Sequence, residues 1–271
     1  MYKFFRKISV IRFNKRSLGQ NFLIDKNIVR KIVNLINMKN RNIIEIGPGD
    51  GALTQEILKQ NPKSVVTIEK DEFFFKKMQN KYSTNKIIKN LNADILKYDL
   101  EKLDLQRPII IGNLPYNISS QILVKMIKFK KWPPDFFDLI FMFQKELGEK
   151  IIGLYQTPNY GRISILANSR LKVIKKFFVS PNCFRPKPKI TSMVIHFKPK
   201  STLLSIKDIL NLEKVTKIFF SNKRKMINKN IKKLFTQKQI KSLNQLDLKS
   251  RPTELNPEMY YKITKLYERI K

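Results

Sequence analysis

The sequence is poor in the residues that usually build metal, disulfide and triad chemistry. Its 271 residues include one cysteine, Cys183, and one histidine, His196. One cysteine cannot form an internal disulfide, and this pair is too small for a zinc site of His and Cys ligands. A catalytic triad would need His196, but the alternating run SMVIHFK predicts an outward-facing strand position for that residue. We therefore predict no metal site.

Long apolar runs are missing as well. No stretch approaches the roughly 20 residues that a membrane-spanning helix needs. The basic and aromatic start, MYKFFRKISVIRF, lacks the continuous apolar stretch and small-residue cleavage site of a secretory signal. An organellar transit peptide is the alternative for this segment. We expect a soluble cytoplasmic protein with no membrane partner.

Acidic residues are few, at 21 against 55 basic ones, which gives a net charge of +34. The basic excess runs from end to end. Such a field attracts polyanions, and neutralised phosphates release counterions that drive binding. The abundance of Lys, Ile and Asn is also typical of an AT-rich genome. The charge therefore favours a nucleic-acid partner without establishing one.

What is present is an alternation of short apolar runs and longer helical stretches. The β-branched runs at 42–46, 64–68, 108–111 and 138–143 predict buried strands, and the segments at 28–36, 52–60, 71–82 and 119–128 predict helices. This alternation indicates an α/β domain with a mostly parallel sheet. Two late strands, at 173–179 and 192–198, flank a proline-punctuated loop and suggest an antiparallel edge.

Strand signals stop after about residue 200. Basic helices are predicted at 206–220, 225–235 and 257–270. The sequence thus predicts two domains, a ligand-binding domain over 1–200 and a small helical domain over 201–271.

The first chemical motif is a glycine-rich turn, IIEIGPGDGALT at 43–54. Gly47, Gly49 and Gly51 follow a strand and precede a helix, where a ligand can approach the backbone closely. The spacing differs from the dinucleotide fingerprint. Together with Glu45 in the strand, it suits a nucleoside with a short charged tail, and an ordinary structural turn is the alternative.

Two carboxylates follow later strands. Glu69 closes the run SVVTIE about 20 residues past the glycines, where an acidic side chain can take both ribose hydroxyls. Asp94 in NADIL follows the expected third strand, where it can accept an adenine amino group. A carboxylate exposed to water at a strand end is the alternative for each.

The motif NLPY at 113–116 directly follows the strand PIIIG. Ligands of open α/β sheets bind at the carboxyl ends of the strands, so this motif falls beside the glycine-rich turn. Pro115 fixes the backbone, so that Asn113 and nearby carbonyls such as that of Leu114 can accept both hydrogens of an exocyclic amine. Tyr116 offers a flat face for a base. Methyl transfer from a sulfonium donor needs only such positioning and polarisation.

With these motifs in place, residues 14–256 resemble the KsgA-type ribosomal RNA adenine dimethyltransferases. The resemblance rests on KRSLGQNFLID (15–25), FQKELGEKI (143–151), YGRISILA (160–167), PNCFRPKPKITSMV (181–194), SNKRKMINKNI (221–231) and RPTEL (251–255), besides the motifs above. In the family that this sequence resembles, the segment that corresponds to SNKRKMINKNI carries a pair of arginines. Lys223–Arg224 here keeps the charge, but one bidentate phosphate grip is lost.

The resemblance implies a class I methyltransferase fold, with seven strands, the last antiparallel, and a helical C-terminal domain. S-adenosyl-L-methionine would be the methyl donor. The cofactor would be contacted by Asn21, Leu23, Gly47, Gly49, Glu69, Asp94 and Asn113. Asn113, Leu114 and Tyr116 would be catalytic, with Phe184 as the second face of an aromatic clamp. Lys223, Arg224 and Lys225 would bind RNA.

The implied substrate is two adjacent adenosines in a hairpin loop near the 3′ end of small-subunit (16S) ribosomal RNA, each methylated twice on N6. We expect a monomer acting on a pre-30S particle. One alternative is an Erm-type enzyme, which methylates one adenosine of large-subunit RNA. Another is a mitochondrial transcription factor of this fold, for which nucleic-acid binding is the main role. A ribosome-assembly role independent of methylation is compatible with the enzyme.

Overall fold

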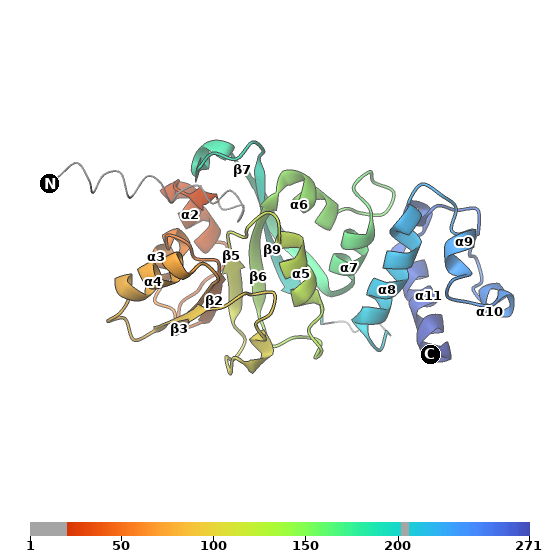
Figure 1. Cartoon of the computed structure of the whole chain (residues 1–271), viewed down its shortest axis with the longest axis horizontal. Helices are drawn as coiled ribbons and strands as arrows, with labels where there is room; N and C mark the ends of the chain where they lie inside the picture. Colours follow the sequence, from red (N-terminus) through yellow and green to blue (C-terminus); the bar gives the residue numbers. More distant parts are fainter. Residues whose placement is uncertain (1–20, 202–205) are drawn as a thin grey trace.

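A computed structural model describes residues 21–201 and 206–271, and a seven-stranded sheet forms its centre (Figure 1). The strand order is β4-β3-β2-β5-β6-β9-β7. The strands are β2 (Asn42–Ile46), β3 (Ser64–Glu69), β4 (Ile88–Asn92), β5 (Ile109–Gly112), β6 (Asp138–Gln144), β7 (Leu171–Val179) and β9 (Ser192–Pro199). The four early runs predicted to be strands thus all form strands of this sheet.

The last strand in the sequence is the antiparallel one. β2 to β6 pair in parallel, whereas β9 pairs antiparallel with both β6 and β7. β9 therefore lies between two strands that precede it in the chain. This confirms the predicted class I methyltransferase sheet, including its antiparallel last strand.

Helices cover both faces of the sheet (Figure 1). α2 (Lys26–Val33) and α3 (Ala52–Leu58) bury their apolar residues in one cluster, against alternate residues of β2, β5 and β6. α5 (Ser119–Ile127), α6 (Lys145–Ile151) and α7 (Arg162–Arg170) pack in a second cluster on the other face. α4 (Glu72–Lys81) lies beside β3 and β4. Because both faces are covered, the central strands are almost wholly apolar.

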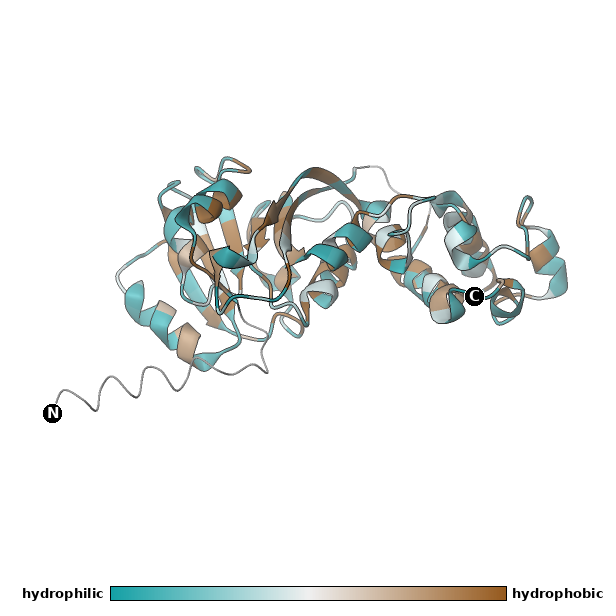
Figure 2. Ribbon diagram, turned by 90° about the horizontal axis from the view of Figure 1, so that it is seen from above, coloured by the Kyte–Doolittle hydropathy of each residue, from teal (hydrophilic) through white to brown (hydrophobic). Residues whose placement is uncertain are grey.

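The C-terminal helices extend beyond α7 as a lobe at one end of the sheet (Figures 1 and 2). They are α8 (Ile209–Phe219), α9 (Asn228–Ile231), α10 (Gln237–Lys241) and α11 (Pro257–Ile270). Their apolar side chains join the second cluster, and the Tyr160 hydroxyl donates to the Leu255 carbonyl at 2.9 Å. The division of the chain at residue 200 stays a prediction.

Two expectations for local structure were wrong. A helix was predicted at 225–235, but only α9 (Asn228–Ile231) forms within that range. The backbone N–H of Ile227, just before α9, donates to the Ser250 carbonyl at 2.9 Å and not to a helical partner. His196 does not face outward. The residue is 3% exposed, and its side chain is hydrogen-bonded to the buried Asp138. The alternation around His196 suggests a strand with one face in water. β9 instead lies between β6 and β7, and both of its faces are packed against apolar clusters, so His196 is buried.

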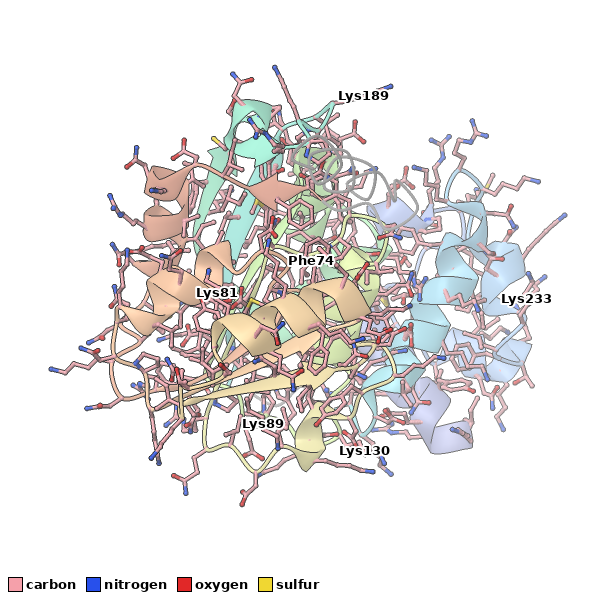
Figure 3. All side chains as sticks on the ribbon, turned by 60° about the vertical axis from the view of Figure 1, so that its left-hand side comes forward. Phe74, Lys81, Lys89, Lys130, Lys189 and Lys233 are labelled. Atoms are coloured by element: carbon pink, nitrogen blue, oxygen red, sulfur yellow. The ribbon has the colours of Figure 1, made fainter. Side chains whose placement is uncertain are left out.

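Charge is spread widely over the surface. Figure 3 shows the labelled lysines Lys89, Lys130, Lys189 and Lys233 pointing outward from several elements. None of the helices in the described part of the chain is long and apolar enough to cross a membrane.

Candidate active site

A cavity of about 170 Å³ lies where the glycine-rich turn meets the loop after β5. A short ribbon of β1 (Phe22–Leu23) and β8 (Phe184–Arg185) brings the N-terminal segment to its rim. The predicted site residues that line it are Asn21, Leu23, Gly47, Gly49, Glu69, Asn113, Leu114 and Tyr116. The fold thus gathers eight predicted positions, spread over 96 positions of the chain (21–116), in one place.

The glycines allow close packing around the turn. Gly47 and Gly49 have φ angles of +66° and +53°, which side chains rarely adopt. A Cβ atom on Gly49 would lie 2.9 Å from the Phe22 ring, and one on Gly47 would lie 3.9 Å from Cδ of Pro115. The turn therefore touches the N-terminal segment on one side and the NLPY motif on the other.

Glu69 is held at the end of β3 by backbone groups. Its Oε2 accepts from the N–H of Gly49 at 3.2 Å, and its Oε1 accepts from the N–H of Asp71 at 2.9 Å. Burial raises the pKa of this carboxyl above its ordinary value, although the two N–H groups oppose that shift. Each carboxylate oxygen has a further lone pair, so Glu69 can still accept hydrogen bonds from a ligand.

Glu45 lies in β2 beneath the turn and also lines the cavity. Its side chain accepts from the Thr54 hydroxyl at 2.5 Å. Burial raises the pKa of Glu45 to about 7, and the nearby Glu69 adds to the shift. The floor of the cavity therefore carries a carboxyl that titrates near neutral pH.

The NLPY motif sits at the end of β5, close to the end of β2. Gly112 makes this approach possible, since a Cβ there would lie 2.7 Å from the Ile46 carbonyl oxygen. The side-chain N–H of Asn113 donates to the Asn21 carbonyl at 2.8 Å. This bond orients the amide, and it leaves the side-chain oxygen as an acceptor for a ligand. The Leu114 side chain is buried, which anchors the loop.

Tyr116 is fixed by a residue of β9, which lies two strands from β5 in the sheet. Its hydroxyl is 2.6 Å from Oγ of the buried Ser192, the first residue of β9. Burial raises the pKa of the Tyr116 hydroxyl, so it stays neutral. A neutral, anchored ring at the cavity wall can present a flat face to a planar ligand.

Several predicted residues do not line the cavity. The Asp94 carboxylate binds Nζ of Lys70 at 2.9 Å and accepts from the N–H of Leu96, and the ion pair lowers its pKa. Phe184 is 3% exposed and lies opposite Leu23 in the β1–β8 ribbon. Lys223, Arg224 and Lys225 are exposed in the C-terminal lobe. The residues 15–20 of the N-terminal signature lie outside the described residues.

Sequence reasoning missed two residues at the site. Phe22 packs its ring over Gly49 and contacts Phe74, with ring centroids 5.0 Å apart. Ser192 anchors Tyr116. The contact of Phe22 had a sequence signal, since Phe22 stands between two predicted cofactor contacts. The role of Ser192 depends on strand pairing, which the sequence does not reveal.

No group of three or more His, Cys, Asp or Glu side chains suited to a metal ion occurs among residues 21–201 and 206–271. The cavity instead combines two buried carboxyls, a backbone turn, an oriented amide and an aromatic ring. This set can bind a nucleoside and hold an amine beside it.

Comparisons with known proteins agree with this geometry. A family model described as ribosomal RNA adenine dimethylase matches residues 11–269. The ribosomal RNA small subunit methyltransferase A of Pelagibacter ubique is 43% identical over 255 residues, which cover 94% of this chain and 97% of that protein.

Two solved structures are similar as well. A dimethyladenosine transferase from Plasmodium falciparum superposes with a TM-score of 0.74 and 25% identity, covering 89% of this chain and 95% of the other. The 23S rRNA methyltransferase ErmE has a TM-score of 0.65 and 20% identity, covering 92% of this chain and all of the other. At that identity the second likeness shows the shared fold alone.

Proposed function

Since the chain belongs to the ribosomal RNA adenine dimethylase family, it is an S-adenosylmethionine-dependent rRNA adenine dimethyltransferase, and we propose that it modifies the small subunit. The target would be two adjacent adenosines in a hairpin loop near the 3′ end of the 16S RNA, each dimethylated on N6. The observation that carries methyl transfer to an adenine amine is the NLPY loop, with its oriented Asn113 amide, at the wall of the cavity beside the glycine-rich turn.

The cavity residues fit S-adenosylmethionine. The two oxygens of Glu69 would accept from the ribose hydroxyls, and the bare backbone at Gly47 and Gly49 would admit the methionine end. Asn21 and Leu23 would cover the cofactor from the β1 side. Asp94 would accept from the adenine amino group once it shares its carboxylate with Lys70. The cofactor supplies an activated methyl group on a positively charged sulfur.

Asn113 and Leu114 would orient the target amine. The Asn113 amide is held by Asn21, so its oxygen can accept one amine hydrogen, and the Leu114 carbonyl can accept the other. Two such bonds direct the nitrogen lone pair toward the methyl group and stabilise the positive charge that develops on nitrogen.

Tyr116 would stack on the flipped adenine, and its bond to Ser192 would keep the ring from rotating away. Phe184 would provide the opposite face only after the β1–β8 ribbon shifts, because its side chain is buried against Leu23. Bases of hairpin loops leave their stack at little cost, so such a loop is a suitable substrate.

The choice of the small subunit rests on the relative named above, which matches nearly end to end. The Erm-type alternative shares the fold, so the fold does not separate it from the small-subunit enzyme. For the second alternative, a purely nucleic-acid-binding protein, the presence of both Asn113 and Tyr116 is an argument against. We further propose a monomer in the cytoplasm that acts on a pre-30S particle. Lys223, Arg224 and Lys225 would grip RNA phosphates, which positions the enzyme.

The test is transfer of labelled methyl groups from S-adenosylmethionine to unmethylated small and large subunits, followed by separation of the product nucleosides. We expect N6,N6-dimethyladenosine in small-subunit RNA. Transfer to large-subunit RNA alone would favour the Erm-type activity. RNA binding without transfer to either would favour a binding or assembly factor.

A further inference from the structure

We propose that the end of the sheet opposite the cavity, where the parallel strands begin, binds a second stretch of RNA phosphate backbone. The contact would be made by a row of basic residues centred on Arg41, Arg107 and Lys198. The proposal rests on the proposed function in one respect, namely that the substrate is RNA. It adds a contact surface outside the cavity and outside the C-terminal lobe.

The row arises from the ends of neighbouring strands. Arg41 immediately precedes β2, Arg107 precedes β5 by two residues, and Lys198 lies near the end of the antiparallel β9. Phe137 immediately precedes β6 and stands between them, since the sheet order is β2-β5-β6-β9. The parallel strands begin at this end of the sheet and finish at the cavity, so the row and the cavity lie at opposite ends of the strands.

The three cations converge on one aromatic ring. The guanidinium carbons of Arg41 and Arg107 are each 4.7 Å from the centroid of Phe137, and Nζ of Lys198 is 4.8 Å from it. One ring attracts a cation by roughly 0.5–2 kcal/mol, but three positive charges held around it repel one another. An anion placed among them would relieve that repulsion.

The row continues on both sides. Lys172 of β7 lies directly opposite Lys198, a pairing of like charges that destabilises a bare sheet. The N–H of the exposed Lys63, just before β3, donates to the Arg41 carbonyl. Because neighbouring strands are about 4.8 Å apart, the row spans about 24 Å from β3 to β7.

In the described part of the chain, no carboxylate forms an ion pair with this row. None of the ion pairs formed among residues 21–201 and 206–271 includes Arg41, Arg107, Lys198, Lys172 or Lys63. Asp138 follows Phe137 in the chain, but it is buried and its partner is His196. An AT-rich genome would scatter lysines over the surface, and it gives no reason for two arginines and a lysine to meet on one ring.

The chemistry of the row favours RNA over a protein partner. Protein interfaces centre on buried apolar anchors, whereas the one aromatic ring here already carries three cations. A line of separated positive charges matches the regular negative charges of a phosphate backbone. A short hairpin with its loop in the cavity would not contact the row, but a longer folded RNA would reach it.

The experiment compares the variant Arg41→Gln/Arg107→Gln/Lys198→Gln with the wild type in binding protein-free, unmethylated small-subunit RNA at several KCl concentrations. Each lost phosphate contact lowers the slope of log affinity against log salt by about 1, so a decrease of about 2–3 is expected. Methyl transfer to a short hairpin substrate should be unchanged. Cofactor binding, measured by calorimetry, should also be unchanged.

The matched control is Lys81→Gln/Lys102→Gln/Lys150→Gln, which removes the same charge from exposed positions outside the row and outside the C-terminal lobe that form no described ion pair. A second variant, Arg41→Lys/Arg107→Lys, keeps the charge and should keep the slope. Equal losses in the first variant and the control would overturn the proposal. So would unchanged RNA binding with weaker binding to the assembled subunit, which would assign the row to a ribosomal protein. The binding readout needs no catalysis, so it stands even if methyl transfer proves to have another target.

Discussion

Glu45 and Glu69 lie on neighbouring strands, and both carboxyls are buried beside the same cavity, yet their partners differ. Glu69 accepts from two backbone N–H groups, which favour its charged form. Glu45 has the Thr54 hydroxyl as its hydrogen-bond partner, and its pKa reaches about 7. At the scale of single residues, these surroundings favour the charged form of Glu69 and raise the pKa of Glu45 to about 7.

Glu69→Gln should weaken S-adenosylmethionine binding by about 10- to 100-fold. The variant loses a charged acceptor, and hydrogen bonds to charged groups contribute roughly 1.5–3 kcal/mol. Titration calorimetry would measure the change. The control is Glu72→Gln, which removes an exposed carboxylate that pairs with Lys76 in the first turn of α4. Equal affinities in both variants and the wild type would remove the ribose-binding role of Glu69.

Glu45→Gln should flatten the dependence of stability on pH. The folded-state pKa of Glu45 is about 7, above its ordinary value of 4.5, so the folded protein keeps a proton that the unfolded chain releases. The stabilisation is complete below pH 4.5 and is lost as the pH rises to about 7, an effect of roughly 3 kcal/mol. Melting temperatures measured from pH 5 to 8 would test this. An unchanged slope in the variant would contradict it.

Asn113→Ala should lower kcat by about 100-fold or more, as removal of one preorganised polar contact usually does. It should weaken cofactor binding far less, because Asn113 is one of several expected cofactor contacts. Single-turnover methyl transfer would measure the chemical step. Asn117→Ala, at an exposed position four residues later, is the control. Wild-type turnover in Asn113→Ala would exclude the polarising role of the amide.

At the scale of elements, the turn between β2 and α3 works together with the β1–β8 ribbon. Gly49→Ala would add a Cβ 2.9 Å from the Phe22 ring at a φ of +53°, which costs about 1–2 kcal/mol in backbone strain alone. We expect a folded protein with cofactor affinity at least 10-fold weaker, measured by calorimetry. Gly161→Ala is the control, since a Cβ there would be 4.0 Å from its nearest neighbour. Equal affinities would show that Phe22 moves aside freely.

Most elements of the sheet could be predicted from the sequence, because buried parallel strands are nearly continuous apolar runs. Residues 42–46 were predicted with their bounds, and the five other predicted strands within one or two residues. No bounds were predicted for β4, which is partly exposed and has no continuous apolar run. His196 was misjudged because its partner, Asp138, comes from a strand 58 positions earlier. The Gly-rich turn, Glu69 and NLPY were recognisable because each follows a strand. The ribbon of Leu23 with Phe184 joins segments 161 positions apart and was not predictable from local patterns.

At the scale of the whole molecule, the net charge of +34 is proposed to bind RNA at two surfaces, the C-terminal lobe and the row centred on Arg41, Arg107 and Lys198. The variant Lys223→Gln/Arg224→Gln/Lys225→Gln should bind small-subunit RNA more weakly, with a salt slope lower by about 2–3, and bind cofactor normally. Filter binding at several salt concentrations would show this. The effect should add to that of the Arg41/Arg107/Lys198 variant, since the two surfaces are separate. No loss of affinity would exclude the lobe as an RNA grip.

The insertion of β9 between β6 and β7 has a consequence for biosynthesis. A nascent chain released as far as β7 has no partner for that strand and an open edge on β6, since 12 residues separate the end of β7 from the start of β9. Open edges invite pairing with other chains. Lys172, Lys175 and Lys176 along β7 are exposed charges of the kind that discourage such pairing. The gap between β6 and β7 can therefore be filled only after β9 has been translated, and the lysines of β7 would disfavour pairing with other chains before then.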